Sequence, residues 1–200
     1  MNPTQSTRLD TRTLFELLLE AGKAINSEVE LEKVVQKVTD IATQLTGAQF
    51  GAFFYNVINT DGEAFLLYTI SGVSREAFSK FPMPRNTKIF EPTFLAKGIV
   101  RYDDVTAQPH YGQNPPYHGM PRGHLPVRSY LAAPVVNPFT GEAIGGLFFG
   151  HPEVGVFSPE SERLLEGITA QAAIAVGNAR LFDEKKAIEQ RLVEQKEQYL

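Results

Sequence analysis

The chain has 200 residues, a formal net charge of −4 and no cysteine. Its hydrophobic fraction of 42% and charged fraction of 21% indicate a soluble globular domain that is large enough to bury a real core. The acidic balance gives no general attraction to nucleic acid or to anionic membranes, and the missing cysteine excludes disulfides, thiolate zinc sites and thiol nucleophiles.

No stretch of the sequence indicates a membrane span or an export signal. The most apolar runs, IGGLFF and YLAAPVV, are much shorter than the roughly 18 residues that a spanning helix needs. The polar start MNPTQSTRLD lacks the apolar core of a signal peptide. We therefore expect a cytoplasmic protein whose sequenced segment contacts neither membrane nor nucleic acid.

Two helices are predicted to come first, after a disordered lead over residues 1–10. Leucine, alanine and isoleucine recur with helical spacing from Thr11 to Ile25. Ser27 and Glu30 have the spacing of a capping box, which predicts the start of a second helix. Its apolar stripe runs to Leu45, and Gly47 is a stop signal.

Strands are predicted on both sides of an irregular central region. FGAFFYNV (50–57) and AFLLYTI (64–70) form a β-hairpin around an Asp-Gly turn, and both are apolar on both faces, so the sheet should be covered on each side. Short helices broken by prolines are expected over 71–97, and IVRYDDV (99–105) is the third strand.

Residues 106–127 carry many prolines and glycines and predict a long irregular loop, a kind of segment that is often functional. YLAAPVV (130–136) and AIGGLFFGH (143–151) then form a second hairpin. Pro134 inside the first of these strands predicts an edge or bulge position, because proline cannot donate to the ladder.

A long C-terminal helix has the clearest start signal. Ser158 is a good N-cap and Pro159 suits the first helical position. A narrow stripe of small and apolar residues follows, and beyond Phe182 the sequence becomes charged but keeps a heptad rhythm. One heptad position holds Leu181, Ile188 and Gln195, and the other holds Lys185, Leu192 and Tyr199. This predicts a weak, polar coiled-coil seam.

Together these elements predict an α/β sandwich of the α+β type, with a mostly antiparallel sheet and the terminal helices on one face. The sequence resembles a GAF domain of the kind found in bacterial sensor histidine kinases of two-component systems. The resemblance spans about residues 12–184 and is carried by VRYDDV, GHLPVRSYLAAPVV, GEAIGGLFFGHPEVGVFSPE and RLLEGITAQAAIAVGNARLFDE. It implies a six-stranded sheet, although the residues show only five strands. The sixth would have to come from 81–90 or from the loop.

The resemblance also implies domain boundaries and a ligand site. The GAF domain covers 11–184, and 185–200 begins a coiled-coil signalling helix. A small-molecule pocket lies beneath the crossover, on the sheet face opposite the terminal helices. The residues that we expect to contact the ligand are Tyr55, Tyr68, Phe94, Tyr102, Asp104, His110, Tyr111, His118, His124, Arg128 and Tyr130.

Several of these residues also have a structural interpretation. Asp104 could cap the segment after it, and Arg128 could pair either with an acidic ligand or with Asp103 or Asp104. The histidines match no metal-ligand spacing, so no metal site is expected. Most of the aromatic residues must be core.

The departures from better-known GAF domains limit the cofactor. No lysine follows Asn178, so the string near the last helix does not reproduce the cyclic-nucleotide pattern. Without cysteine, the chain cannot hold a bilin through a thioether bond or carry the thiol chemistry of GAF-fold methionine sulfoxide reductases. The identity of any ligand stays open.

No catalytic motif is present: there is no nucleophile elbow, P-loop or dinucleotide fingerprint. We expect a non-catalytic sensory domain that binds a small molecule, forms a homodimer through its terminal helices and signals to an output domain, such as a histidine kinase, in the same polypeptide. The alternative is a ligand-free dimerisation and relay module. A photosensor with a non-covalent chromophore is a third reading.

Overall fold

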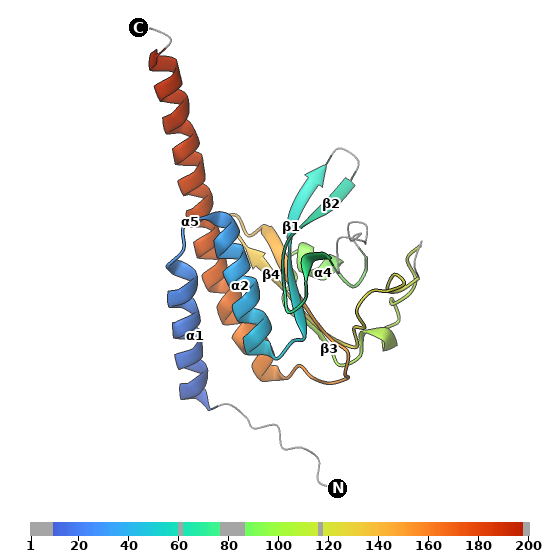
Figure 1. Cartoon of the computed structure of the whole chain (residues 1–200). Coiled ribbons are helices and arrows are strands. Elements are labelled where there is room, and N and C mark those ends of the chain that lie inside the picture. Colours follow the sequence, from blue (N-terminus) through green and yellow to red (C-terminus); the bar gives the residue numbers. More distant parts are fainter. Residues whose placement is uncertain (1–9, 60–61, 77–86, 116–117, 198–200) are drawn as a thin grey trace.

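Five strands form one antiparallel sheet in this computed structural model (Figure 1). β1 (Phe50–Asn59) pairs with β2 (Gly62–Ser71) on one side and β5 (Ala143–His151) on the other. β4 (Ser129–Val136) lies between β5 and the short edge strand β3 (Val100–Tyr102). The strand order is therefore β2-β1-β5-β4-β3, and both predicted hairpins are confirmed.

The structure describes residues 10–59, 62–76, 87–115 and 118–197, and it describes no side chains for 56–59 and 62–68. Within these ranges the sheet has five strands, not the six that the family resemblance implies. Residues 81–86 lie outside the described part. The described loop residues between β3 and β4 form no strand, because repeated prolines remove the donors that a ladder requires.

Three helices lie on one face of the sheet; two of them pack on its strands, and the first packs against those two helices (Figure 1). They are α1 (Thr11–Asn26), α2 (Leu31–Thr46) and α5 (Pro159–Glu197). The predicted helices are present, but the predicted capping box is wrong. The Ser27 hydroxyl instead donates to the Ala24 carbonyl, and α2 starts without a side-chain cap.

Strand alternation divides the buried residues between two cores. Phe53, Leu131 and Leu147 point toward the helices and pack with residues such as Ile25 and Ile168. The intervening residues of the same strands point to the other face, where α4 (Glu91–Phe94), the 3₁₀ turn η1 (Val105–Ala107) and the loop up to residue 128 cover them. The prediction that both sheet faces are covered is therefore confirmed.

Helix α5 extends far beyond the domain. Ser158 caps it, because its hydroxyl accepts the N–H of Ser161, as the sequence predicted. The helix is buried at intervals up to Ala179, and every residue from Arg180 to Glu197 is exposed. Figure 1 shows this half of α5 projecting away from the sheet. Among the described residues, no helix has the length and apolar character needed to cross a membrane.

Candidate functional site

Phe148 lies at the centre of an aromatic cluster on the sheet face opposite the long helices. Its ring centroid is 5.1 Å from that of Phe90 and 5.3 Å from those of Phe54 and Phe94. Edge-to-face and tilted contacts at these separations are favourable for aromatic rings. Phe148 itself is buried, so the floor of the candidate site is a packed aromatic layer.

Two glycines of β5 make room for this layer. A Cβ atom at Gly146 would lie 2.7 Å from the Phe148 ring, and one at Gly150 would lie 2.6 Å from the Phe50 ring. Contacts this short do not occur, so any other residue at these positions would displace a ring. The glycines therefore let aromatic side chains lie flat against the backbone of the sheet.

Two hydroxyl groups are buried within the apolar cluster. The Tyr130 hydroxyl lies 3.5 Å from the Ile89 carbonyl, to which it donates. Thr93 is fully buried, and its hydroxyl has no well-formed hydrogen bond among the described residues, although it lies near Tyr130. Burial raises the pKa of Tyr130 well above its usual value, so this phenol stays neutral. The site is thus apolar with two neutral hydroxyls.

Tyr102 and residues of the loop lie over one side of the cluster. The Tyr102 ring stacks on Tyr130 with centroids 5.9 Å apart and an interplanar angle of 22°. Tyr111, Met120 and Leu125 are only partly buried where they pack against the same cluster. The loop side is therefore less enclosed than the floor around Phe148.

Asp104 and Arg128 form an ion pair at the edge of the loop. Both carboxylate oxygens of Asp104 accept from the Arg128 guanidinium, and one also caps η1 by accepting the N–H of Thr106. The Arg128 and Thr106 hydrogen bonds hold the pKa of Asp104 well below its usual value. Of the two roles predicted for Arg128, the internal ion pair is the one that the structure contains.

The three loop histidines do not converge. His110 and His118 are exposed, and Nδ1 of His118 lies 3.2 Å from the Gly112 carbonyl. His124 is half-buried, with Nδ1 at 2.7 Å from the Leu125 carbonyl. Across the described residues, no three histidine or carboxylate side chains are grouped in a way that could hold a metal ion.

A family model described as "GAF domain" matches residues 28–177, which include α2, all five strands, the crossover and the first part of α5. The chain belongs to the GAF domain family.

Solved structures support the same fold. The GAF domain of a phosphoenolpyruvate-protein phosphotransferase from Coxiella burnetii has a TM-score of 0.70 and 17% identity, over 88% of this chain and 99% of that one. Free methionine-R-sulfoxide reductase from Neisseria meningitidis has a TM-score of 0.64 and 15% identity, over 90% and 99%. The GAF domain of a putative sensor histidine kinase from Pseudomonas syringae pv. tomato has a TM-score of 0.58 and 15% identity, over 88% and 93%.

Of the six aromatic residues predicted to contact a ligand, Tyr55 is not part of this cluster. Tyr55 points to the helix face of the GAF domain, where its ring lies 5.0 Å from that of Phe53 and under the Arg180 guanidinium at 4.9 Å. The side chain of Tyr68 lies outside the described residues. Of the other predicted residues, Phe94, Tyr102, Tyr111 and Tyr130 do come together.

Four residues of the candidate site were not predicted from the sequence: Phe54, Phe90, Thr93 and Phe148. A usable signal was the spacing of Gly146, Phe148 and Gly150, which places one large ring between two bare backbone positions on the same sheet face. The apolar pattern alone could not show which face holds the loop, because both faces are covered.

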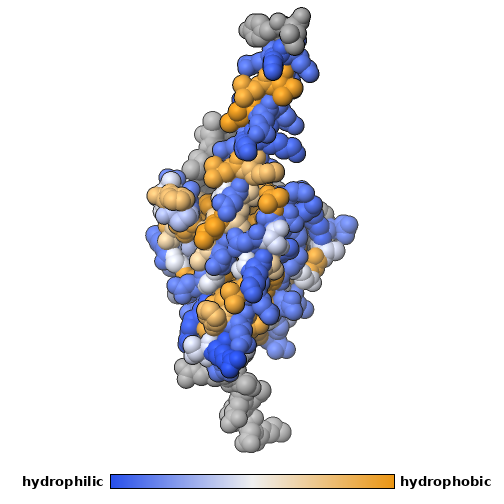
Figure 2. All heavy atoms as spheres, turned by 90° about the vertical axis from the view of Figure 1, so that its left-hand side faces the viewer, coloured by the Kyte–Doolittle hydropathy of each residue, from blue (hydrophilic) through white to orange (hydrophobic). Residues whose placement is uncertain are grey.

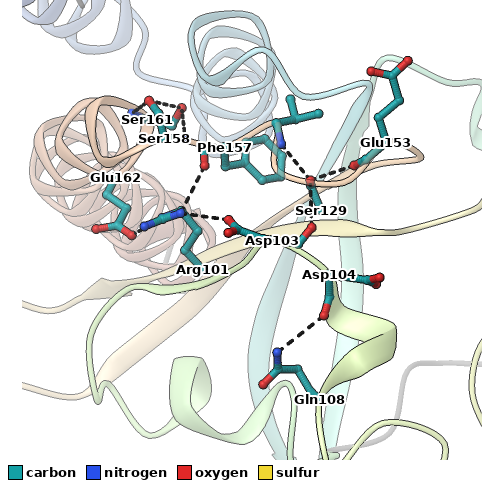
Figure 3. A network of polar contacts seen from close by, with 11 residues as sticks. Arg101, Asp103, Asp104, Gln108, Ser129, Glu153, Phe157, Ser158, Ser161 and Glu162 are labelled. Carbon is teal, nitrogen blue, oxygen red and sulfur yellow. Dashed lines mark hydrogen bonds and ion pairs between the residues drawn. The ribbon is translucent and has the colours of Figure 1, made fainter. Parts of the chain in front are cut away.

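A polar network connects the end of β3 to the start of α5 in this GAF domain (Figure 3). Arg101 points toward the helices, and its Nε donates to the Glu162 carboxylate in the first turn of α5. Its Nη1 group donates to the Asp103 carboxylate at 3.1 Å and to the Phe157 carbonyl at 3.2 Å. One side chain therefore ties the edge strand to the segment that leads into the long helix.

Ser129 extends this network to the β5–α5 connection (Figure 3). Its buried hydroxyl lies 2.7 Å from the Glu153 carbonyl, to which it donates, and accepts the Val156 N–H at 2.9 Å. The Asp103 carbonyl accepts the Gly155 N–H at 3.0 Å. Asp103 thus contacts the segment that leads into α5, and the adjacent Asp104 binds Arg128 at the end of the loop. These two neighbouring residues join the candidate site to the long helix.

Proposed function

We propose that this GAF domain is a non-catalytic, cytoplasmic sensory or regulatory module that passes its state through α5 to an output domain, such as a histidine kinase, in the same polypeptide. The observation that carries the proposal is α5 itself. This helix spans 39 residues, packs on the domain through its first half and projects with exposed apolar side chains through its second. A helix built in this way can transmit a shift in packing over a distance.

The proposed input is a small molecule bound beneath residues 106–127. Two observations support this: the buried hydroxyls of Thr93 and Tyr130, and the partial burial of the loop side chains above them. A ligand that paired with these hydroxyls would move the loop, which Asp104 holds through Arg128. Asp103 and Arg101 would carry that movement to Glu162 on α5.

Composition favours a regulatory role over an enzymatic one. One structural neighbour is named as a reductase of free methionine-R-sulfoxide, but this chain contains no cysteine, so a thiol could not attack a sulfoxide here. The histidine-kinase neighbour shares the fold at 15% identity, which supports the domain type and leaves the output domain as a proposal.

A second candidate function is a ligand-free dimerisation and relay module. The packing of Phe54, Phe90 and Phe94 around Phe148 favours it, because these rings fill the floor of the sheet face on which a ligand would lie. Both candidates share the homodimer through the terminal helices and differ only in whether a molecule occupies the loop side.

Native mass spectrometry of the protein as purified, followed by denaturation, separates the two candidates. The sensor predicts a mass above that of the polypeptide and a small molecule released in stoichiometric amount. Thr93→Val, which replaces a buried hydroxyl with a methyl group of similar size, should lower the occupancy, whereas Thr140→Val in the exposed β4–β5 turn should not. A polypeptide mass with nothing released, also after incubation with cell extract, would favour the ligand-free relay.

A further inference from the structure

Four of the six exposed large apolar side chains of α5 follow one heptad series, which continues from the domain into the projecting segment; the other two are Phe182 and Val193. Ile174 is 49% exposed, Leu181 65% and Ile188 52%, and they are spaced seven residues apart. They take the d position of a coiled coil. Leu192, which is 59% exposed, and Lys185 take the a position. Figure 2 shows apolar and hydrophilic atoms alternating along this helix on the face that it presents.

The part of this series that lies on the domain suits a second copy of the chain. The g positions beside Ile174 are Ala170 and Gly177, which are small and uncharged. Apart from the neighbouring backbone of α5 itself, a Cβ atom at Gly177 would meet no atom of the described residues within 4 Å. Two copies can therefore bring these helix surfaces together without burying a charge. In a two-fold symmetric dimer, each copy contributes the same surface to the contact.

The projecting part has a different charge pattern. Its g positions are Glu184 and Arg191, and its e positions are Glu189 and Lys196. In a parallel, in-register pair, each g residue lies beside the next e residue of the other helix. Glu184 then meets Glu189, Arg191 meets Lys196, and Lys185 meets its own copy at the a position. All of these contacts join like charges.

The uncharged surface around Ile174 favours pairing of two α5 helices, whereas the like charges from Glu184 onward oppose it. We propose that in the homodimer the two α5 helices pair through Ile174 and Leu181 and are held apart by like charges from Glu184 onward. The segment 184–196 is then an open seam that rearrangement of the domain can close. This inference rests on the homodimer of the proposed function and adds where its helix pairing ends.

The test uses the absence of cysteine from the chain, which makes single-cysteine reporters unambiguous. Ile174→Cys and Leu192→Cys are prepared separately, and the rate of disulfide formation between copies is measured under mild oxidation. At low ionic strength we expect the Ile174→Cys protein to cross-link about tenfold faster. At about 1 M salt, where exposed charges are screened within about 3 Å, the Leu192→Cys rate should rise.

Exchanging the charges tests the cause directly. Adding Glu189→Lys and Arg191→Glu to the Leu192→Cys protein converts both like-charge contacts to attractive ones, and should raise its cross-linking rate about tenfold. The matched control is Glu194→Lys with Lys186→Glu, which exchanges the same charge types on the outward side of the helix and should leave the rate unchanged.

Two results would overturn the open seam alone: equal cross-linking at positions 174 and 192 in the parent sequence, or no response to the Glu189 and Arg191 exchange. A protein that stays a monomer of 22.2 kDa and cross-links at neither position would overturn the homodimer of the proposed function as well. Light scattering on the same samples distinguishes these cases.

Discussion

Tyr130 illustrates how burial sets chemistry at a single residue. Its hydroxyl makes one long contact of 3.5 Å, and its ring is stacked on Tyr102 within the aromatic cluster. The phenol is neutral because ionising it inside the cluster would leave a charge without water. This environment suits a neutral partner for the hydroxyl and disfavours an anionic one.

Tyr130→Phe should have an effect that depends on pH. Near pH 7 the variant should change the free energy of unfolding by no more than about 1 kcal/mol, because the lost hydrogen bond is long. The pKa of Tyr130 is raised in the folded state, so its stabilising contribution is present below the unfolded pKa of about 10 and is lost as the pH rises above it. The variant should therefore gain stability relative to the parent between pH 9 and 11.

Urea unfolding of the two proteins across this pH range measures the difference. Both proteins share every other tyrosine, so their titrations cancel in the comparison. A difference in unfolding free energy that stays constant from pH 8 to pH 11 would show that the Tyr130 hydroxyl is not buried as described.

Arg128 and Asp104 show what sequence can and cannot decide for one residue. The chemistry of arginine predicted a carboxylate partner, and Asp104 was predicted to cap the next segment. Both features are present together, since one Asp104 oxygen accepts from Thr106 and from Arg128. The sequence could not choose between a ligand and an internal partner, because that depends on how the loop returns to β4 beside the end of β3.

At the scale of elements, the sequence predicted which helices and strands are present better than it predicted where they end or which sheet face a residue occupies. The strand predicted over 99–105 is only Val100–Tyr102, because Asp104 turns the chain into η1. Pro134 was predicted at an edge or bulge, and it lies beyond the residues of β4 that pair with β3. Tyr55 was assigned to the ligand side but faces the helices, and only the alternation of observed neighbours fixes that choice.

The packing of β5 against α4 gives a prediction at this scale. Gly146→Ala should lower the free energy of unfolding by about 1–3 kcal/mol, because the new methyl group would lie 2.7 Å from the Phe148 ring and 2.8 Å from Thr93 Cγ2. Gly177→Ala is the contrasting variant. It adds a methyl group to α5 where, apart from the neighbouring backbone of the helix, no atom of the described residues lies within 4 Å, and should raise stability by up to about 1 kcal/mol.

Thermal and urea unfolding of the two alanine variants check this prediction. Near-ultraviolet circular dichroism of Gly146→Ala should also report altered packing of the aromatic cluster. If Gly146→Ala were as stable as the parent protein, the rings around Phe148 would be free to shift, and the floor of the candidate site would be more adaptable than the described packing.

For the whole molecule, the sequence was sufficient to predict the layers but not the ligand. Helical periodicity, two hairpins and a long proline-rich crossover predicted a covered sheet with terminal helices on one face, and the structure has that arrangement (Figure 1). The composition of the candidate site depends on residues distant in sequence, such as Thr93, Tyr130 and Phe148. Their proximity follows from strand order and register, which local patterns do not determine.

At the scale of the whole molecule, a series of polar contacts links the loop of the candidate site to α5. The loop reaches α5 through Asp104, Asp103 and Arg101, and α5 then leaves the domain with unpaired apolar residues. A projecting helix without tertiary contacts is only marginally stable in water, and packing against a partner helix would stabilise it. Pairing with a second copy is the arrangement that we propose.

The most direct test is the mass of the full 200-residue chain in solution, measured by light scattering together with an Ile174→Glu variant. We expect a parent particle of twice 22.2 kDa, and a variant that is folded but has a mass of 22.2 kDa. Phe139→Glu, at a side chain that is 94% exposed in the β4–β5 turn, should remain dimeric. A monomeric parent protein, or a dimer that Ile174→Glu leaves intact, would contradict relay through paired α5 helices.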